Sequence, residues 1–82
     1  MIKVLYFGRL SDRAQRREEQ LDLPQGISTL SGLKNWLEDS RELGGALLDP
    51  SVKTMINQVL VHEDAALSGD EEIGFLPPVG GG

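Results

Sequence analysis

The fold is decided by the stretch Phe75-Leu76-Pro77-Pro78-Val79-Gly80-Gly81-Gly82, with which the sequence ends. Each proline fixes its φ angle and lacks an N–H donor, so a strand that reaches Leu76 cannot continue as a central member of a sheet. We therefore expect the last strand to end at Leu76 and the chain to leave the domain there. This divides the sequence into a folded domain over residues 1–76 and an extended tail over residues 77–82.

The predicted tail is stiff at its root and slender at its tip. Pro77-Pro78 favours a polyproline II conformation, and the glycines that follow have no Cβ, which lets the backbone pass close to other atoms. Glycine-rich ends are also common as disordered termini, and the glycines alone do not distinguish the two cases. The apolar, proline-stiffened root favours a functional tail, so we take the terminal carboxylate of Gly82 as the candidate reactive group.

Length and composition indicate one small globular domain. A chain of 82 residues buries only about 60 % of its unfolded surface, which leaves little room for a deep active site. The lack of cysteine excludes disulfides, thiolate metal sites and a thiol nucleophile. No apolar run approaches the roughly 20 residues of a membrane span, and the sequence opens on a strand-like run rather than a signal peptide. We therefore expect a cytoplasmic protein without a membrane partner.

The formal net charge is −5, and the charges are unevenly distributed along the sequence. Residues 61–82 hold five acidic residues and no lysine or arginine, which predicts an acidic base for the tail. Such a surface disfavours nucleic acid as the partner of the tail and favours a protein with a basic entrance. Half of the basic residues fall in one early segment, where acids interrupt them as on a solvated face: Arg9, Arg13, Arg16 and Arg17.

Hydrophobic patterns predict four strands and two helices, arranged as a mixed sheet packed on one main helix in an α+β domain. The expected strands cover residues 2–7, 18–23, 55–62 and 71–76, and the helices cover residues 10–15 and run from Ser28 or Thr29 to Gly44-Gly45. The long helix carries an apolar stripe at helical spacing, formed by Leu30, Leu33, Trp36 and Leu37.

The segment over residues 55–62 also predicts a docking surface. If Val59 and Val61 face the core, strand alternation places Leu60 outward among polar neighbours. An outward leucine beside Phe7 forms an exposed apolar patch of the kind that binds a partner.

The side chains offer no catalytic or metal-binding set. The sequence has no catalytic pair of carboxylates, no Ser/His/Asp or Cys/His arrangement and no phosphate-binding glycine loop, and His62 is its single histidine. We therefore expect no catalysis by this chain alone, no metal site and no bound cofactor. The carboxylate of Gly82 is a poor acyl donor until a partner activates it, so the tail implies an activating enzyme.

Four stretches resemble one family over nearly the whole length of the chain. They are the opening Met-Ile-Lys-Val-Leu-Tyr-Phe-Gly, the Ile56-Asn57-Gln58 segment with Leu60-Val61, the acidic turn at Asp70-Glu71-Glu72, and the Phe-x-Pro-Pro-Val-x-Gly-Gly ending. Together they are similar to the small subunits of molybdopterin synthase, in the ubiquitin-like sulfur-carrier family (MoaD/ThiS-like). The resemblance implies a β-grasp fold and a cytoplasmic heterotetramer with the large synthase subunit.

The resemblance also implies a chemistry for the tail. A ubiquitin-activating-like enzyme uses ATP to adenylate Gly82, the adenylate becomes a thiocarboxylate, and the tail enters the large subunit to donate sulfur to cyclic pyranopterin monophosphate, forming the dithiolene of molybdopterin. By position, Gly81 and Gly82 are the functional pair. The residues implied to contact partners are Phe7, Leu60, Phe75, Leu76, Pro77, Pro78, Val79 and Gly80.

The sequence departs from the family pattern at two positions, and it leaves three alternative functions open. Gly69 stands one place earlier than in the usual acidic turn, and Ser11 replaces an expected charged residue, so contacts with partners can differ. Related carriers for thiamine, tRNA thiolation or cysteine synthesis share the fold and the Gly-Gly end. A ubiquitin-like modifier would instead attach its tail to lysines of other proteins, and a β-grasp interaction module would have an inert tail.

Overall fold

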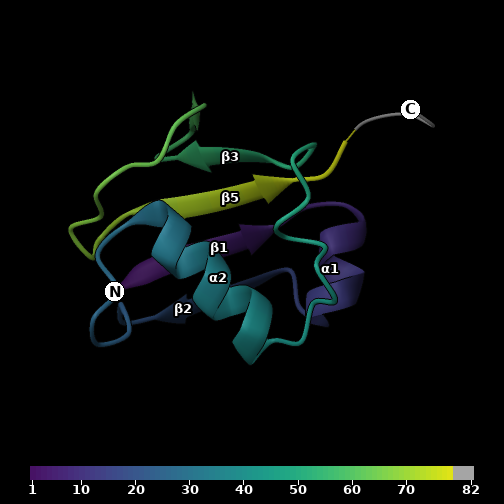
Figure 1. The fold of residues 1–82 in the computed structure, drawn as a ribbon, viewed down its shortest axis with the longest axis horizontal. Helices are drawn as coiled ribbons and strands as arrows, with labels where there is room; N and C mark the ends of the chain where they lie inside the picture. Colours follow the sequence, from purple (N-terminus) through teal and green to yellow (C-terminus); the bar gives the residue numbers. More distant parts are fainter. Residues whose placement is uncertain (79–82) are drawn as a thin grey trace.

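The structure, a computed structural model, describes residues 1–78. Its elements follow the chain as β1 (Ile2–Tyr6), α1 (Arg9–Ala14), β2 (Glu18–Leu21), α2 (Leu30–Ser40), β3 (Lys53–Ile56), β4 (Val59–Val61) and β5 (Glu72–Leu76). The strands form a sheet in the order β2-β1-β5-β3-β4, and α2 crosses one of its faces (Figure 1). The predicted α+β architecture, a mixed sheet on one main helix, is confirmed.

The last strand lies at the centre of the sheet. β5 pairs in parallel with β1 and antiparallel with β3, while β2 and β4 form the two edges through antiparallel pairs. The strand ends at Leu76, where Pro77 removes the next N–H donor, as the sequence predicts. Consequently the first and last strands lie side by side, and the chain leaves the sheet from its middle.

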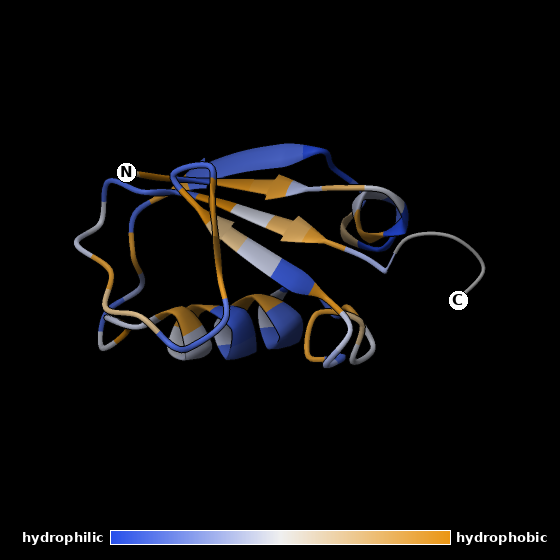
Figure 2. Ribbon diagram, turned by 90° about the horizontal axis from the view of Figure 1, so that it is seen from above, coloured by the Kyte–Doolittle hydropathy of each residue, from blue (hydrophilic) through white to orange (hydrophobic). Residues whose placement is uncertain are grey.

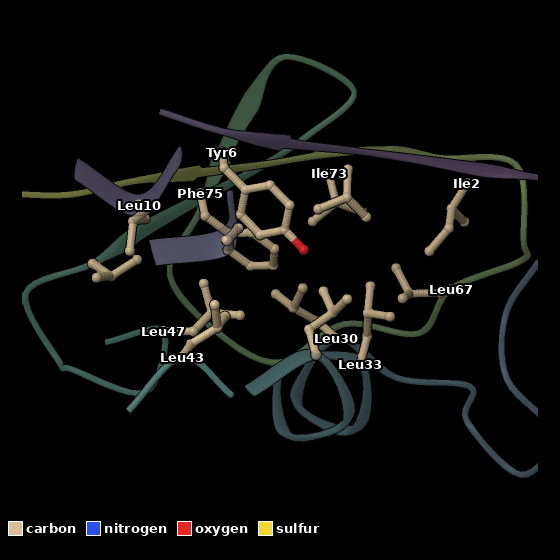
Figure 3. Packing of buried hydrophobic residues seen from close by; sticks show 14 residues of the cluster. Ile2, Tyr6, Leu10, Leu30, Leu33, Leu43, Leu47, Leu67, Ile73 and Phe75 are labelled. Atoms are coloured by element: carbon tan, nitrogen blue, oxygen red, sulfur yellow. The ribbon is translucent and has the colours of Figure 1, made fainter. Parts of the chain in front are cut away.

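The core lies between the sheet and α2, which Figure 2 shows along one side of the strands. Alternation along β1 and β5 turns one set of side chains toward the helix, and these pack against leucines at helical spacing on α2. Two leucines of the segment after α2 close one end of this core (Figure 3). The main buried side chains are those of Ile2, Val4, Tyr6, Leu30, Leu33, Leu37, Leu43, Leu47, Ile73 and Phe75.

Helix α2 begins where the sequence predicts and ends earlier. Thr29 is the N-cap, and its side chain accepts a hydrogen bond from the backbone N–H of Gly32 at 3.1 Å. The helix stops at Ser40 rather than near Gly44-Gly45, because Glu42 takes a left-handed φ of 52°. The carboxylate of Glu38 then holds the following loop by accepting the N–H groups of Gly45 and Leu47 at 2.7 and 3.0 Å.

The single strand predicted over residues 55–62 is wrong, because the chain reverses in the middle of it. Asn57 and Gln58 have φ angles of 51° and 69° and connect β3 to β4 as a two-residue hairpin loop with two left-handed residues. Asn57 also bonds to β5, since its N–H donates to the carbonyl of Glu72 at 2.8 Å and its Oδ1 accepts the N–H of Glu72 at 2.9 Å. These hydrogen bonds with a distant segment stabilise the turn, which the sequence around Asn57 does not predict.

Candidate functional site

The root of the tail lies against the turn between β1 and α1. Pro77 and Pro78 are half-buried there, and a Cβ on Gly8 would lie only 2.8 Å from Cγ of Pro77. The two prolines also line a groove of about 470 Å³ together with Leu10, Ala46 and Val52. The predicted reactive residues Gly81 and Gly82, and the neighbouring Val79 and Gly80, lie outside the described residues 1–78.

The acidic base predicted for the tail is wrong for three of the five acids on which the prediction rested. The acids Asp70, Glu71 and Glu72 lie at the start of β5, next to the N-terminus, whose amino group is 3.4 Å from Oδ1 of Asp70. The tail leaves from the other end of the strand, where α1 also lies, because β1 and β5 run parallel (Figure 1).

Near the root, charges of both signs line the groove: Arg9, Asp12, Arg13 and Asp49. The acids precede Pro77 by only a few residues in the sequence, but the length of β5 separates them from it in space. The groove at the tail root therefore carries charges of both signs rather than acidic charge alone.

The face of the sheet opposite α2 carries an apolar patch. Cross-strand register places Leu5, Gly74, Met55 and Leu60 in one row across four strands. Phe7 lies over Gly74, where a Cβ would meet Cε2 of Phe7 at 3.2 Å and Cε of Met55 at 3.4 Å. We call Leu5, Phe7, Met55 and Leu60, with the bare backbone of Gly74, the outer apolar patch.

Sequence reasoning found Phe7 and Leu60 of the outer apolar patch and missed Leu5, Met55 and Gly74. Phe7 and Leu60 are 39 % and 49 % exposed, as expected of a docking surface, and the row of Leu5, Gly74 and Met55 connects them. Period-two alternation from Phe7 back to Leu5 was an available signal for the third member. Val59, expected to face the core, is instead 63 % exposed because it follows the hairpin turn on a short edge strand.

Phe75 and Leu76 occupy different environments. The ring of Phe75 has no exposed surface and stacks on Tyr6, with ring centroids 6.2 Å apart. Its side chain is therefore unavailable to a partner, contrary to its expected contact role, and alternation explains why: Phe75 follows Ile73 on the inward face. Leu76 is half-buried and pairs with Lys53 of β3, at the point where the chain turns toward the tail.

A polar network under the sheet fixes the edge strand β2 to α2. The hydroxyl of Tyr6 donates to Oε2 of Glu19 at 2.7 Å, and Nε of Arg41 donates to the same oxygen at 3.1 Å. Burial and the bond to Glu19 raise the pKa of Tyr6. Burial alone would raise the pKa of Glu19 as well, but the bonds from Arg41 and Tyr6 outweigh it and the pKa is lowered. The network is structural: it holds a charged carboxylate beside the core.

Ser11 and Gly69, the two positions that depart from the family pattern, each have a structural role within this chain. Ser11 donates its hydroxyl to the carbonyl of Gly8 at 2.7 Å, so it stabilises the start of α1. Gly69, with a φ of 113°, lies in a turn whose N–H groups point at one carboxylate. Glu71 accepts the N–H of Ser68 at 2.7 Å and that of Gly69 at 2.9 Å, and these bonds lower its pKa to about 2.

Among the described residues 1–78, no helix is long and apolar enough to cross a membrane.

The candidate site is made of three surface features at one end and one face of the sheet. They are the stiff tail root on Gly8, the groove beside α1, and the outer apolar patch. These features lie on the surface, and the described root of the tail, Pro77-Pro78, is close to the end of the outer apolar patch at Phe7.

Solved structures with the same fold support this description. The crystal structure of SAMP1 from Haloferax volcanii matches with a TM-score of 0.77 at 21 % identity, covering 99 % of this chain and 98 % of that one. The solution structure of the small archaeal modifier protein 1 from Methanosarcina acetivorans also has a TM-score of 0.77, at 24 % identity, covering 99 % and 95 %. The fold is the ubiquitin-like β-grasp.

The sequence comparisons go further than the fold. The model of the ThiS family matches residues 4–82, and the chain belongs to that family. It is also 33 % identical over its full length to the molybdopterin synthase sulfur carrier subunit of Escherichia coli, and covers all of that protein. The resemblance seen in the sequence is thereby confirmed, and the chain is a homologue of a sulfur carrier subunit.

Proposed function

We propose that this protein is the sulfur-carrying small subunit of a molybdopterin synthase. The observation that carries the proposal is the junction at Leu76, where the central strand ends at two prolines near an exposed apolar patch and a glycine-rich sequence follows. The full-length identity to the Escherichia coli carrier subunit supports the choice of pathway.

The proposed chemistry takes place on the carboxylate of Gly82. A ubiquitin-activating-like enzyme brings that carboxylate to the α-phosphorus of ATP, so an acyl adenylate forms and pyrophosphate leaves. A sulfur nucleophile then attacks the acyl carbon and AMP leaves, which yields the thiocarboxylate. In the synthase the thiocarboxylate sulfur, at the sulfide oxidation level, bonds to a carbon of cyclic pyranopterin monophosphate and displaces an oxygen substituent of that carbon. Water then cleaves the acyl–sulfur bond, which leaves the sulfur on the pterin and restores the carboxylate.

The chain itself contributes delivery rather than catalysis in this proposal. Phe7 and Leu60 of the outer apolar patch contact the large subunit, and the tail root directs Gly81 and Gly82 into its active site. Because a dithiolene contains two sulfur atoms and each tail carries one, two deliveries are needed for each product. A cytoplasmic heterotetramer of two small and two large subunits fits this stoichiometry. ATP is used by the activating partner, and this chain binds no cofactor of its own.

Substitutions in the tail test the proposal. A valine at Gly81 adds bulk and removes easy access to positive φ where the tail enters its partners, and a misplacement of about 1 Å costs on the order of 100-fold in rate. We expect Gly81→Val and deletion of Gly82 to abolish thiocarboxylate formation or its use in synthase turnover. Gly80→Ala, farther from the acyl carbon, has a milder effect and is the matched control.

Two measurements decide between the proposal and its alternatives. Intact mass of protein isolated from its native host shows whether one oxygen has been replaced by sulfur, whereas a ubiquitin-like modifier appears as conjugates to other proteins. Turnover of molybdopterin synthase separates this role from that of carriers for thiamine, tRNA thiolation or cysteine synthesis. Full synthase activity in Gly81→Val would overturn the carrier role, and it would leave an interaction module with an inert tail. The melting temperature stays unchanged in all three variants, because the substitutions lie beyond β5.

A further inference from the structure

The turn between β1 and α1 requires a glycine. The carbonyl of Phe7 accepts the N–H of Leu10 at 3.1 Å, which closes a tight turn over residues 7–10. Gly8 is the second residue of this turn and has φ 56° and ψ −136°, a combination that fits the first central position of a type II′ turn. Glycine adopts it without steric cost, whereas a side chain there is strained.

The same glycine touches the tail. A Cβ at Gly8 would lie 2.8 Å from Cγ and 3.6 Å from Cδ of Pro77. Carbon atoms make their best contact at about 3.5–4.0 Å, so the first of these distances is a clash. The proline ring is tied to its own backbone, so Cγ can shift only through a change of ring pucker and cannot rotate away as a flexible side chain would. Relief therefore requires the chain after Leu76 to move.

The same turn also contains Phe7, a member of the outer apolar patch. Phe7, which precedes Gly8, belongs to the outer apolar patch and lies over Gly74. Its N–H donates to the carbonyl of Phe75 at 3.1 Å, which ties the turn to the last strand immediately before the tail. One short turn thus contacts a partner through Phe7 and supports the tail root through Gly8.

We propose that Gly8 is a positioning residue, which sets the direction in which the tail leaves the domain relative to the outer apolar patch. The inference rests on the proposed function, because a direction matters only if a docked partner must receive the tail. A partner held on Phe7 then finds the acyl end of the tail at a fixed angle, and a side chain at residue 8 turns the tail away without weakening docking.

The test compares Gly8→Ala with Gly26→Ala in sulfur transfer by the synthase, using carrier variants already converted to the thiocarboxylate. Gly26 also has a positive φ, 84°, which strains an alanine there, but a Cβ would meet no atom within 4 Å. With the carrier as the varied substrate, KM reports docking and kcat reports delivery of the tail. We expect Gly8→Ala to lower kcat on the order of tenfold or more with KM unchanged, and Gly26→Ala to change neither.

A double-mutant cycle with Pro77→Ala identifies the contact responsible. Pro77→Ala removes the ring atoms that a Cβ at residue 8 would meet, so Gly8→Ala should lower kcat much less in that background. An equal loss in both backgrounds, or identical kinetics for Gly8→Ala and Gly26→Ala, overturns the positioning role.

Two further results decide the remaining cases. If Gly8→Ala does not fold, Pro77→Ala alone decides, because it lies beyond β5 and leaves the turn intact: unchanged kcat overturns the inference and a lowered kcat supports it. A wild-type carrier that transfers no sulfur overturns the proposed function, and the positioning role with it.

Discussion

The inner face of the sheet packs Ile73 and Phe75 of β5 against α2, whereas on the outer face the same strand presents Gly74 beneath Phe7 and Met55. Both faces carry apolar side chains, and both follow from alternation along β1 and β5. They differ in what covers them, since the inner face has a helix and the outer face is exposed at Phe7 and Leu60. The buried inner face therefore stabilises the fold, and the exposed outer face is available for binding.

The largest effect is expected from truncating the inner face. Phe75→Ala removes a ring with no exposed surface and its stacking on Tyr6, so we expect a loss of about 3–5 kcal/mol in the free energy of unfolding. Phe7→Ala is the matched variant on the outer face, and it should change stability far less while weakening partner binding. Denaturant unfolding of both proteins measures the difference. Equal destabilisation by the two would remove the distinction between the faces.

The two adjacent glutamates of β2 extend the comparison to charge. Glu19 lies on the inner side and accepts hydrogen bonds from Tyr6 and Arg41, while Glu18 lies on the outer side, 3.2 Å from Nζ of Lys3 in an exposed pair. Glu19→Gln should cost about 2 kcal/mol, because it leaves Arg41 without its charged acceptor. Glu18→Gln should cost at most about 1 kcal/mol. Urea midpoints of the two variants measure this, and a larger loss for Glu18→Gln would contradict it.

Leu60→Glu sharpens the comparison from the outer side. We expect roughly a tenfold loss of affinity for the large synthase subunit, about 1.4 kcal/mol, because a charge replaces an apolar contact in the outer apolar patch. Stability should change by no more than about 0.5 kcal/mol, since Leu60 is half-exposed. Val59→Glu, one residue away and 63 % exposed but outside the patch row, is the control. Titration calorimetry with the large subunit checks both, and unfolding of Leu60→Glu would show that its assigned facing is incorrect.

The smallest effect concerns Glu71, in the turn before β5 that belongs to neither face. Its pKa is lowered to about 2 by the N–H of Ser68 and its neighbours, so folding favours the charged carboxylate. This contribution is complete above the ordinary glutamate pKa of about 4.5 and is lost as the pH falls toward about 2. Glu71→Gln should therefore flatten the acid dependence of stability in that window. Melting curves from neutral to low pH measure this change. If Glu71→Gln loses stability in acid as steeply as the parent protein, the turn does not stabilise the charged carboxylate of Glu71.

Local patterns predicted the elements that local chemistry determines. The apolar alternation of β1, the leucine spacing of α2, the Thr29 cap and the proline stop after Leu76 are all read within a few residues. The hairpin at Asn57-Gln58 was missed because its left-handed turn depends on hydrogen bonds between Asn57 and Glu72, which are far apart in the sequence. Strand pairing of this kind is invisible to a pattern along one segment.

The candidate site was predictable in the same uneven way. Leu60 was found from alternation, and Phe7 was named beside it and by the family resemblance. Alternation back from Phe7 could have found Leu5, whereas Met55 joins the patch only through the register of the paired strands. Phe75 was assigned to a partner on the strength of its neighbours in the tail motif, although alternation from Ile73 places it inside. The reactive role of Gly81 and Gly82 stays a prediction, because these residues lie outside the part of the chain that the structure describes.

The central position of β5 has a consequence for biosynthesis. A ribosome makes this strand after the other four strands of the sheet, yet β1 can find its parallel neighbour only when β5 has emerged. Such a long-range pairing delays folding until the loop between the two strands can close. A nascent chain that stops before Ile73 therefore has neither a complete sheet nor a tail, and proteolysis can remove it as unfolded protein. Synthesis order thus couples the appearance of the carrier's tail to the completion of its fold.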